Sequence, residues 1–257
     1  MRFQLLSDLH LETETFTPTP APEAELLVLA GDIDSGWDGL GLFRGWPVPV
    51  LFVAGNHEFD ERELTQAWPE LRARCQALGI RLLECESLVL TDRAGKRIRF
   101  VATTRWSDFD VFGPAQRERA QRAGSYFMKI MRATRNGAPF DAAAVREEAL
   151  ICRDWLKAEL SRPKGSWDST VVITHFAPSL RSADPRYGSQ AGTASFCNAD
   201  DALLPHADMW IHGHLHCQFD YRVEHPGGGS TRVVCNSRGH SGKGEADRHQ
   251  PLLVLDV

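Results

Sequence analysis

Side chains that can bind metal ions occur at five places along this 257-residue sequence, and each place closely follows a short apolar segment. Four of these side chains are histidines, two are aspartates and one is an asparagine: Asp8, His10, Asp32, Asn56, His175, His214 and His216. Singly these signals are weak, because a Gly-Asp pair is commonly a turn and an isolated histidine is commonly a hydrogen-bonded core residue. Five such clusters in one chain are hard to explain as turns, and together they predict a metal site.

The number and kind of donors indicate what the site would hold. Seven donors are too many for one ion with about four to six ligands, but they suit two ions that share a carboxylate. Imidazole and carboxylate donors without a thiolate fit manganese, iron, cobalt, nickel or zinc better than a structural cysteine–zinc site. Two ions roughly 3.5–4 Å apart are a known device for phosphoryl chemistry, because they neutralise phosphate charge and acidify a bridging water.

The apolar segments that precede the donors have the length and composition of buried strands. Each is rich in Val, Ile, Leu or Phe, as in strands covered on both faces. We expect strands near residues 3–6, 26–30, 50–54, 98–102, 171–174 and 209–211. In open α/β folds, sites form outside the carboxyl ends of the strands, so five such ends can bring the donors to one point.

The rest of the chain predicts helices and a hairpin. Residues 61–78 have a helical composition, and Asp141 is a candidate cap for a second helix over residues 141–160. Residues 221–224 and 231–235 flank a turn rich in proline and glycine, which indicates a β-hairpin.

Nothing in the sequence marks a domain boundary, so we expect a single domain over residues 1–257. Within it, residues 107–160 have little strand character and are expected to form a mainly helical insertion or cap. The segment 116–135 carries six basic residues, which fit either a solvated helix face or a cap that attracts an anionic substrate.

Bulk composition argues against several other classes of protein. A net charge of −5 does not suit a surface built to bind nucleic acid, so nucleic acid is not the favoured partner. No apolar run approaches the roughly 18–20 residues of a membrane span, and we expect neither a membrane segment nor a signal peptide. The six cysteines are scattered without a Cys-x-x-Cys pair, which predicts reduced thiols and a cytoplasmic location.

At the predicted metal-binding residues, the sequence resembles the calcineurin-like metallophosphoesterase family. The family pattern runs D-x-H, GD, GNH followed by D or E, an isolated H, and GHxH. Its order and approximate spacing match over residues 1–58 and 170–216. The matching motifs are Asp8-Leu9-His10, Gly31-Asp32, Gly55-Asn56-His57-Glu58, His175 and Gly213-His214-Leu215-His216.

The resemblance implies an α/β fold in which two mixed β-sheets pack face to face with helices outside, as a four-layer αββα sandwich. It also implies two divalent metal ions, with manganese expected first and iron, zinc, cobalt or nickel as alternatives. The first ion would be held by Asp8, His10, Asp32 and His216. The second would be held by Asp32, Asn56, His175 and His214, so that Asp32 bridges the two.

The same resemblance implies a phosphoester hydrolase in which a metal-bridging hydroxide attacks phosphorus. His57 would be the catalytic residue, protonating the leaving oxygen or stabilising charge beside the phosphate. We expect a small phosphoester or nucleotide as substrate, with phosphodiesters slightly favoured over monoesters. A DNA-processing nuclease of the same superfamily and a non-catalytic metal-binding scaffold are the alternatives.

The sequence departs from the protein Ser/Thr phosphatase branch, in which arginines near the GD and GNH motifs bind the phosphate. No arginine lies beside either motif here. Arg105, Arg238 and His212 are the substitute candidates for binding substrate, although each arginine could equally be a surface residue and His212 could instead support a ligand. A ligating histidine also needs a partner on its second ring nitrogen, and Glu58 or Asp34 could supply one.

Overall fold

The first of the two large β-sheets carries the N-terminal donors. The computed structural model describes residues 1–257 and shows this sheet in the strand order β13-β1-β2-β3-β4. Strands β1 to β4 run parallel, and β13 pairs antiparallel with β1 at the edge. The strand bounds are β1 (Arg2–Leu6), β2 (Leu26–Leu29), β3 (Val50–Phe52), β4 (Ile80–Leu82) and β13 (Val254–Asp256).

The second sheet carries the C-terminal donors and has the order β11-β12-β10-β9-β6-β5. Its four inner strands are parallel, and both edge strands pair antiparallel. The bounds are β5 (Glu86–Thr91), β6 (Arg97–Thr103), β9 (Ser169–Thr174), β10 (Met209–His212), β11 (Gln218–Glu224) and β12 (Ser230–Asn236). Strands β11 and β12 confirm the predicted hairpin, and both sheets are mixed, as expected.

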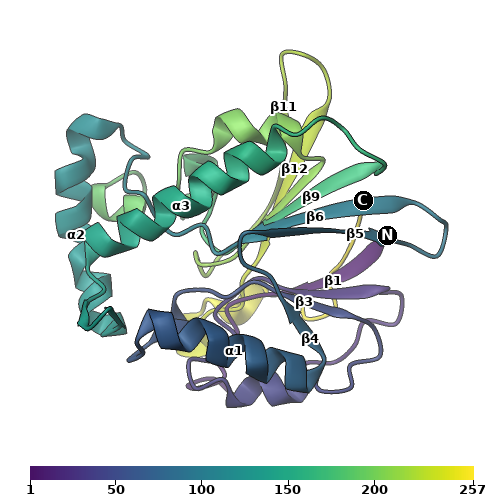
Figure 1. The fold of residues 1–257 in the computed structure, drawn as a ribbon, viewed down its shortest axis with the longest axis horizontal. Helices are drawn as coiled ribbons and strands as arrows, with labels where there is room; N and C mark the ends of the chain where they lie inside the picture. The colour runs from purple at the N-terminus through teal and green to yellow at the C-terminus, as the bar shows by residue number, and fades with distance from the viewer.

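Alternate residues of the strands pack into separate apolar layers, which produces the sandwich. Phe3 of β1 and Ile173 of β9 belong to the core between the sheets. Leu6 of β1 belongs instead to the core on the outer face of the first sheet, together with Leu71 of α1. Helix α1 (Leu64–Leu78) therefore covers one outer face, and α3 (Ala142–Leu160) covers the other (Figure 1). The four-layer αββα arrangement is confirmed.

The two covering helices begin and end as their sequences indicate. The Asp141 side chain accepts hydrogen bonds from the backbone N–H groups of Ala143 and Ala144, as a residue that caps a helix N-terminus does. Helix α1 ends at Gly79, whose φ of 76° lies in the left-handed region that glycine adopts without strain.

The region 107–160 contains a helix that lies apart from both sheets. Helix α2 (Arg117–Met131) is at the left of Figure 1 and packs against α3 and a short 3₁₀ helix rather than on a sheet. It ends before the two short strands β7 (Thr134–Arg135) and β8 (Ala138–Pro139). The 3₁₀ helices are η1 (Asp38–Phe43), η2 (His57–Phe59), η3 (Pro114–Gln116), η4 (Leu180–Ser182), η5 (Ala191–Ser195), η6 (Asp201–His206), η7 (Ser241–Lys243) and η8 (Ala246–Arg248).

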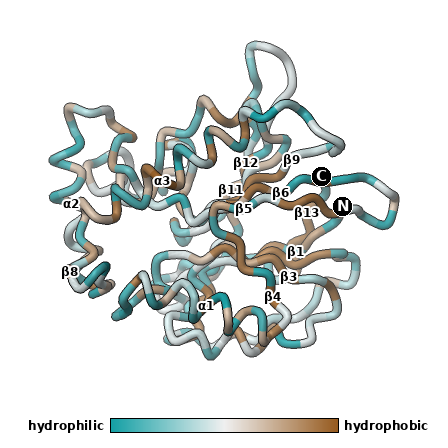
Figure 2. Tube along the Cα trace, viewed as in Figure 1, coloured by the Kyte–Doolittle hydropathy of each residue, from teal (hydrophilic) through white to brown (hydrophobic).

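Hydropathy along the chain follows these layers. Figure 2 shows the apolar segments concentrated in the inner strands and the hydrophilic ones in the connecting loops. None of the helices has the length and apolar character needed to cross a membrane. All six cysteines are free thiols, as their scattered spacing predicts.

Candidate metal centre

Loops that leave the carboxyl ends of β1, β2, β9 and β10 bring six of the seven predicted donors together. Donor atoms of the first group all lie within 4.8 Å of one another, and so do those of the second group. The first group is Asp8, His10, Asp32 and His216, and the second is Asp32, His175 and His214. Asp32 belongs to both groups, so its carboxylate lies between two potential metal positions.

The backbone at these donors is unusually strained. A positive φ is uncommon for residues other than glycine, and such strain clusters at functional sites, where the surrounding structure over-determines it. Five donors have left-handed φ angles: Asp8 (53°), His10 (48°), Asp32 (53°), His214 (72°) and His216 (49°). Backbone hydrogen bonds hold this geometry, because the N–H of Asp8 donates to Gly31 and that of His10 donates to Asp32.

Two glycines of the motifs are needed because ligand side chains approach their backbone closely. A Cβ atom at Gly55 would lie 2.2 Å from Oδ1 of Asp32, and one at Gly213 would lie 2.6 Å from Oδ2 of Asp8. No larger residue fits either position without displacing a carboxylate. The glycines of the GNH and GHxH motifs therefore belong to the site's geometry.

Unpartnered buried atoms test whether the second group suits a metal ion. Buried polar atoms in folded proteins are nearly always hydrogen-bonded. Three atoms around this group are buried without a hydrogen bond: Oδ2 of Asp32, Oδ1 of Asn56 and Nε2 of His175. The first and the last of them face each other at 3.1 Å, as two ligands of one ion would. Because the atoms are two oxygens and an imidazole nitrogen, a divalent cation would satisfy all three. Asn56, the seventh predicted donor, thus has a buried oxygen that a metal ion could satisfy.

Each histidine of the second group is held by a backbone carbonyl. Nδ1 of His175 donates to the carbonyl of Ala30 at 2.8 Å, and Nε2 of His214 donates to that of Ser195 at 3.1 Å. These bonds fix the tautomer and leave the opposite ring nitrogen of each histidine available as a ligand.

The histidines of the first group are held by carboxylates that the sequence did not reveal. His10 and His216 direct their Nε2 atoms toward each other at 2.9 Å, as two ligands of one ion would. Nδ1 of His10 donates to Glu12 at 3.0 Å, and Nδ1 of His216 donates to Glu245 at 2.8 Å. These two glutamates do the work considered for Glu58 and Asp34 from the sequence.

Glu58 and Asp34 instead shape the loops that carry the ligands. The buried Glu58 carboxylate accepts the backbone N–H groups of Asp32, Ile33 and Gly55, and so ties the loop after β2 to the loop after β3. Asp34 accepts backbone N–H groups of the turn that follows it. Neither carboxylate contacts an imidazole, which corrects the partner role expected for them.

His57 lies beside the two groups. Its backbone N–H donates to Oδ1 of Asp32 at 2.8 Å, and its ring centre is 5.1 Å from that of His10. Nδ1 donates to Oδ2 of Asp60 at 2.7 Å, which leaves Nε2 unengaged. Burial lowers the pKa of His57, but the carboxylates of Asp32 and Asp60 outweigh burial and raise it to about 10.

Comparison with known proteins agrees with this arrangement. Residues 1–218 match the family model of the calcineurin-like phosphoesterases. The chain belongs to this family. It is therefore a phosphoester hydrolase by family, and both the resemblance and the fold expected from the motifs are confirmed.

Two solved structures of hydrolases are similar to the chain to different degrees. The crystal structure of a phosphopantetheinyl hydrolase from Mycobacterium tuberculosis has a TM-score of 0.71 and 19% identity, over 97% of this chain and 92% of that chain. A dimetal phosphatase from Danio rerio has a TM-score of 0.47 and 14% identity, over 90% of this chain and 86% of that chain. No curated protein matches the chain in sequence. The likeness to the Mycobacterium tuberculosis enzyme concerns the fold.

Two of the residues considered for substrate binding in this phosphoesterase are fully enclosed. The Arg105 guanidinium is buried and bonded to the carboxylates of Asp108 and Asp200, at 2.9 Å in each case. The buried His212 ring is bonded to Ser182 and to the carbonyl of Gly213, and burial lowers its pKa to about 4. Neither side chain is accessible to a substrate, so both expectations are corrected to structural roles.

Arg238 lies nearer to the phosphoesterase centre and is already paired. Its backbone N–H donates to the carbonyl of Ser7, which places it next to the Asp8 loop. Its guanidinium donates to Glu14 at 3.0 Å. The neighbouring His240, which the sequence did not single out, stacks on His10 with ring centres 4.7 Å apart, and its side chain is 26% exposed.

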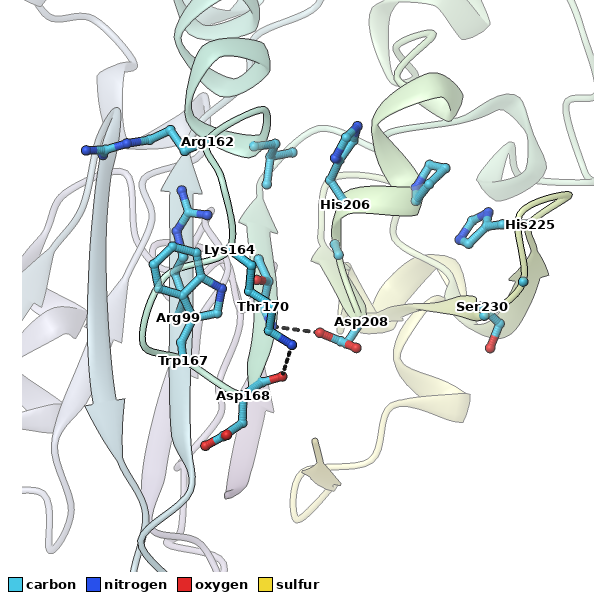
Figure 3. Close-up of a pocket in the computed structure, with 15 residues that line it drawn as sticks. Arg99, Arg162, Lys164, Trp167, Asp168, Thr170, His206, Asp208, His225 and Ser230 are labelled. Atoms are coloured by element: carbon cyan, nitrogen blue, oxygen red, sulfur yellow. Dashed lines mark hydrogen bonds between the residues drawn. The ribbon is translucent and has the colours of Figure 1, made fainter.

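A hollow of about 360 Å³ lies elsewhere on the phosphoesterase, at the amino ends of β9, β10 and β12 (Figure 3). None of the seven donors lines it. Its Arg99 is neutralised by Glu159 at 2.7 Å, and Asp208 accepts the backbone N–H of Thr170. The metal donors are at the carboxyl ends of the strands, so this hollow is separate from the metal centre.

Proposed function

We propose that the chain is a dinuclear metal-dependent phosphoesterase that prefers phosphodiesters to monoesters. The observation that carries this proposal is the Asp32 carboxylate shared by the two donor groups, whose Oδ2 is buried without a hydrogen bond, as are Oδ1 of Asn56 and Nε2 of His175. We assign the first ion to Asp8, His10, Asp32 and His216, and the second to Asp32, Asn56, His175 and His214. Manganese is the ion with which we would load the protein first.

The side chains divide the chemistry between them. Two such ions, when bound, neutralise the phosphoryl oxygens and lower the pKa of a water. His57 is held at Nδ1 by Asp60 and can present a protonated Nε2 to the leaving oxygen. Asp60 is one of the carboxylates that raise the pKa of His57, and it therefore favours the protonated ring. We therefore assign His57 as the general acid and Asp60 as the residue that positions it.

The charge around the centre supports a diester as the substrate. A phosphomonoester carries close to two negative charges near neutral pH, whereas a diester carries one. Neither arginine considered from the sequence is free to take the extra charge, because Arg105 is bound by two aspartates and Arg238 by Glu14. The name of the Mycobacterium tuberculosis hydrolase indicates one substrate class to include, phosphopantetheinyl esters.

We further propose that residues 107–160 are an insertion in a single domain and border the substrate site. Phe127 of α2 packs edge-on against Phe196, at 5.0 Å between ring centres, and Phe196 lies 4.9 Å from the ring of His214. Helix α2 thus reaches the second donor group through one aromatic side chain. Its position suits a wall that selects the leaving group.

The experiment compares bis-p-nitrophenyl phosphate with p-nitrophenyl phosphate, at equal concentration, using the manganese-loaded protein. Faster turnover of the diester is expected. Faster turnover of the monoester would overturn the diester preference and keep the dinuclear mechanism. No turnover of either compound by protein shown to hold two ions would overturn the catalytic proposal and favour a binding scaffold.

A further inference from the structure

Three side chains able to bind a metal ion meet outside the two catalytic groups. Glu84 and Cys85 lie between β4 and β5, and Cys152 lies on α3. Their donor atoms are all within 4.8 Å of one another, although Cys152 is 67 residues or more from the other two along the chain. None of these residues has a part in the chemistry proposed above.

The separations within this cluster match those between ligands of one ion. Oε1 of Glu84 is 3.3 Å from Sγ of Cys152 and 3.8 Å from Sγ of Cys85. Around a tetrahedral zinc ion, with bonds of about 2.3 Å to sulfur and about 2.0 Å to oxygen, neighbouring ligand atoms are roughly 3.5 Å apart. The donors thus need only small adjustments to bind one ion.

The carboxylate is oriented as that of a metal ligand usually is. Oε2 of Glu84 accepts the backbone N–H of Thr104 at 2.7 Å and its hydroxyl at 2.9 Å, so the carboxylate cannot rotate freely. Oε1 is the atom turned toward the thiols, and it also accepts the hydroxyl of Thr103 at 3.0 Å. Hydrogen bonds of this kind, made by the atom that does not bind metal, fix a ligand before the ion arrives.

We propose that Glu84, Cys85 and Cys152 form a binding site for one thiophilic divalent cation of the zinc class. Cys85 is only half-buried, so water can reach the site and fill a fourth position. Binding converts both thiols to thiolates, and their two protons leave to the solvent. Two thiolates select zinc or cadmium over manganese, so this site and the catalytic centre would prefer different ions.

The position of the cluster indicates what a bound ion would do. Cys152 belongs to the outer helix α3, whereas Glu84 and Cys85 belong to a segment that leaves the first sheet. The hydroxyl oxygen of Thr104, which holds Glu84, also lies 2.9 Å from the carbonyl oxygen of Ala54, directly before the GNH motif. An ion here would fasten α3 to the support of the loop that carries Asn56.

Cobalt(II) is the probe for this site. Reduced, chelator-treated protein is titrated with cobalt(II), and the intense thiolate-to-cobalt charge-transfer absorption is followed. The catalytic groups contain only nitrogen and oxygen donors, so this band reports the cysteine site alone. At saturation the band should have the intensity of one cobalt–dithiolate centre per chain, whatever cobalt the catalytic groups also bind, and it should disappear when zinc is added. Absence of the band in folded wild-type protein overturns the proposal, whether or not phosphoesterase activity is present.

Cysteine variants test which residues give rise to the cobalt absorption band. Cys85→Ala and Cys152→Ala should each lose it, while Cys75→Ala, at a buried cysteine on α1, should keep it. A band that survives both of the first two substitutions overturns the assignment. Should either variant fail to fold, alkylation of wild-type Cys85 replaces it: zinc should block the reaction, and an unchanged rate counts against the site.

Discussion

Nδ1 of His57 and Oδ2 of Asp60 are 2.7 Å apart, in a pair that lies beside the two donor groups. The carboxylate fixes the plane of the imidazole, so that Nε2 points away from the hydrogen bond between Nδ1 and Asp60. An imidazole held in this way can protonate a leaving oxygen without binding a metal itself. The pair would therefore contribute to turnover without contributing to metal binding. Substitutions at the two positions test this division of roles.

The first prediction is that His57→Ala keeps its metal ions and loses most of its turnover. The alanine removes the general acid, which typically contributes about 10²–10⁴-fold to the rate. The loss should be largest for a substrate with an alkyl leaving group, which needs protonation most. Elemental analysis and kcat for such a diester are the measurements. Turnover equal to that of the wild type would remove His57 from the mechanism.

Asp60→Asn should move the alkaline limb of the pH–rate profile to lower pH. Asp60 is one of the charges that raise the pKa of His57, so its removal lowers that pKa. Because the acid form is the active one, activity is then lost at a lower pH on the alkaline side. Asp38→Asn, at an exposed carboxylate whose ion pair is with Arg74, is the control. Identical alkaline limbs for both variants would contradict the positioning role of Asp60.

Much of the centre could be predicted because it depends on local sequence. Each ligand loop follows an apolar strand, and parallel strands bring their carboxyl ends to one edge, so Asp8, Asp32 and His175 could be expected to meet. The partners of the ligands could not be predicted in this way. Glu245 reaches His216 from a loop 29 residues away, with no periodic pattern to indicate its position.

Burial was the other property that the sequence did not reveal. Arg105 follows an apolar strand as the metal ligands do, yet it is completely buried, and its carboxylate partner Asp200 is 95 residues away in the sequence. Strand β5 was missed for a different reason. Its half-buried and exposed residues alternate, so it lacks the continuous apolar run of the inner strands.

Asp32→Ala should abolish binding of both metal ions. The carboxylate belongs to both donor groups, so its removal takes one ligand from each ion and the link between them. Circular dichroism would confirm the fold, and elemental analysis after gel filtration would count the ions. Two ions per chain in this variant would contradict the assignment of Asp32 as a bridge.

Glu245→Gln should weaken the binding of the first metal ion and leave the affinity for the second largely unchanged. Glu245 holds Nδ1 of His216, and loss of such a partner commonly costs about 10–100-fold in metal affinity. Competition with a chelator would resolve the two affinities. Glu147→Gln, at an exposed glutamate of α3, is the matched control and should change neither. Equal weakening of both ions would show that Glu245 acts through the fold instead.

Gly55→Ala should lower both the metal content and the thermal stability of the protein, whereas Gly41→Ala should lower neither. The new methyl group at residue 55 would lie 2.2 Å from Oδ1 of Asp32 and 2.7 Å from Cε1 of His175. Those atoms belong to ligands and cannot move without leaving their positions, and overpacking of this kind costs about 1–3 kcal/mol. At Gly41 a Cβ meets nothing within 4 Å, and the φ angle there is not positive. Thermal unfolding and elemental analysis of both variants are the measurements. Full metal content in Gly55→Ala would show that the Asp32 loop can yield, and that the glycine is not required for the close approach of its carboxylate.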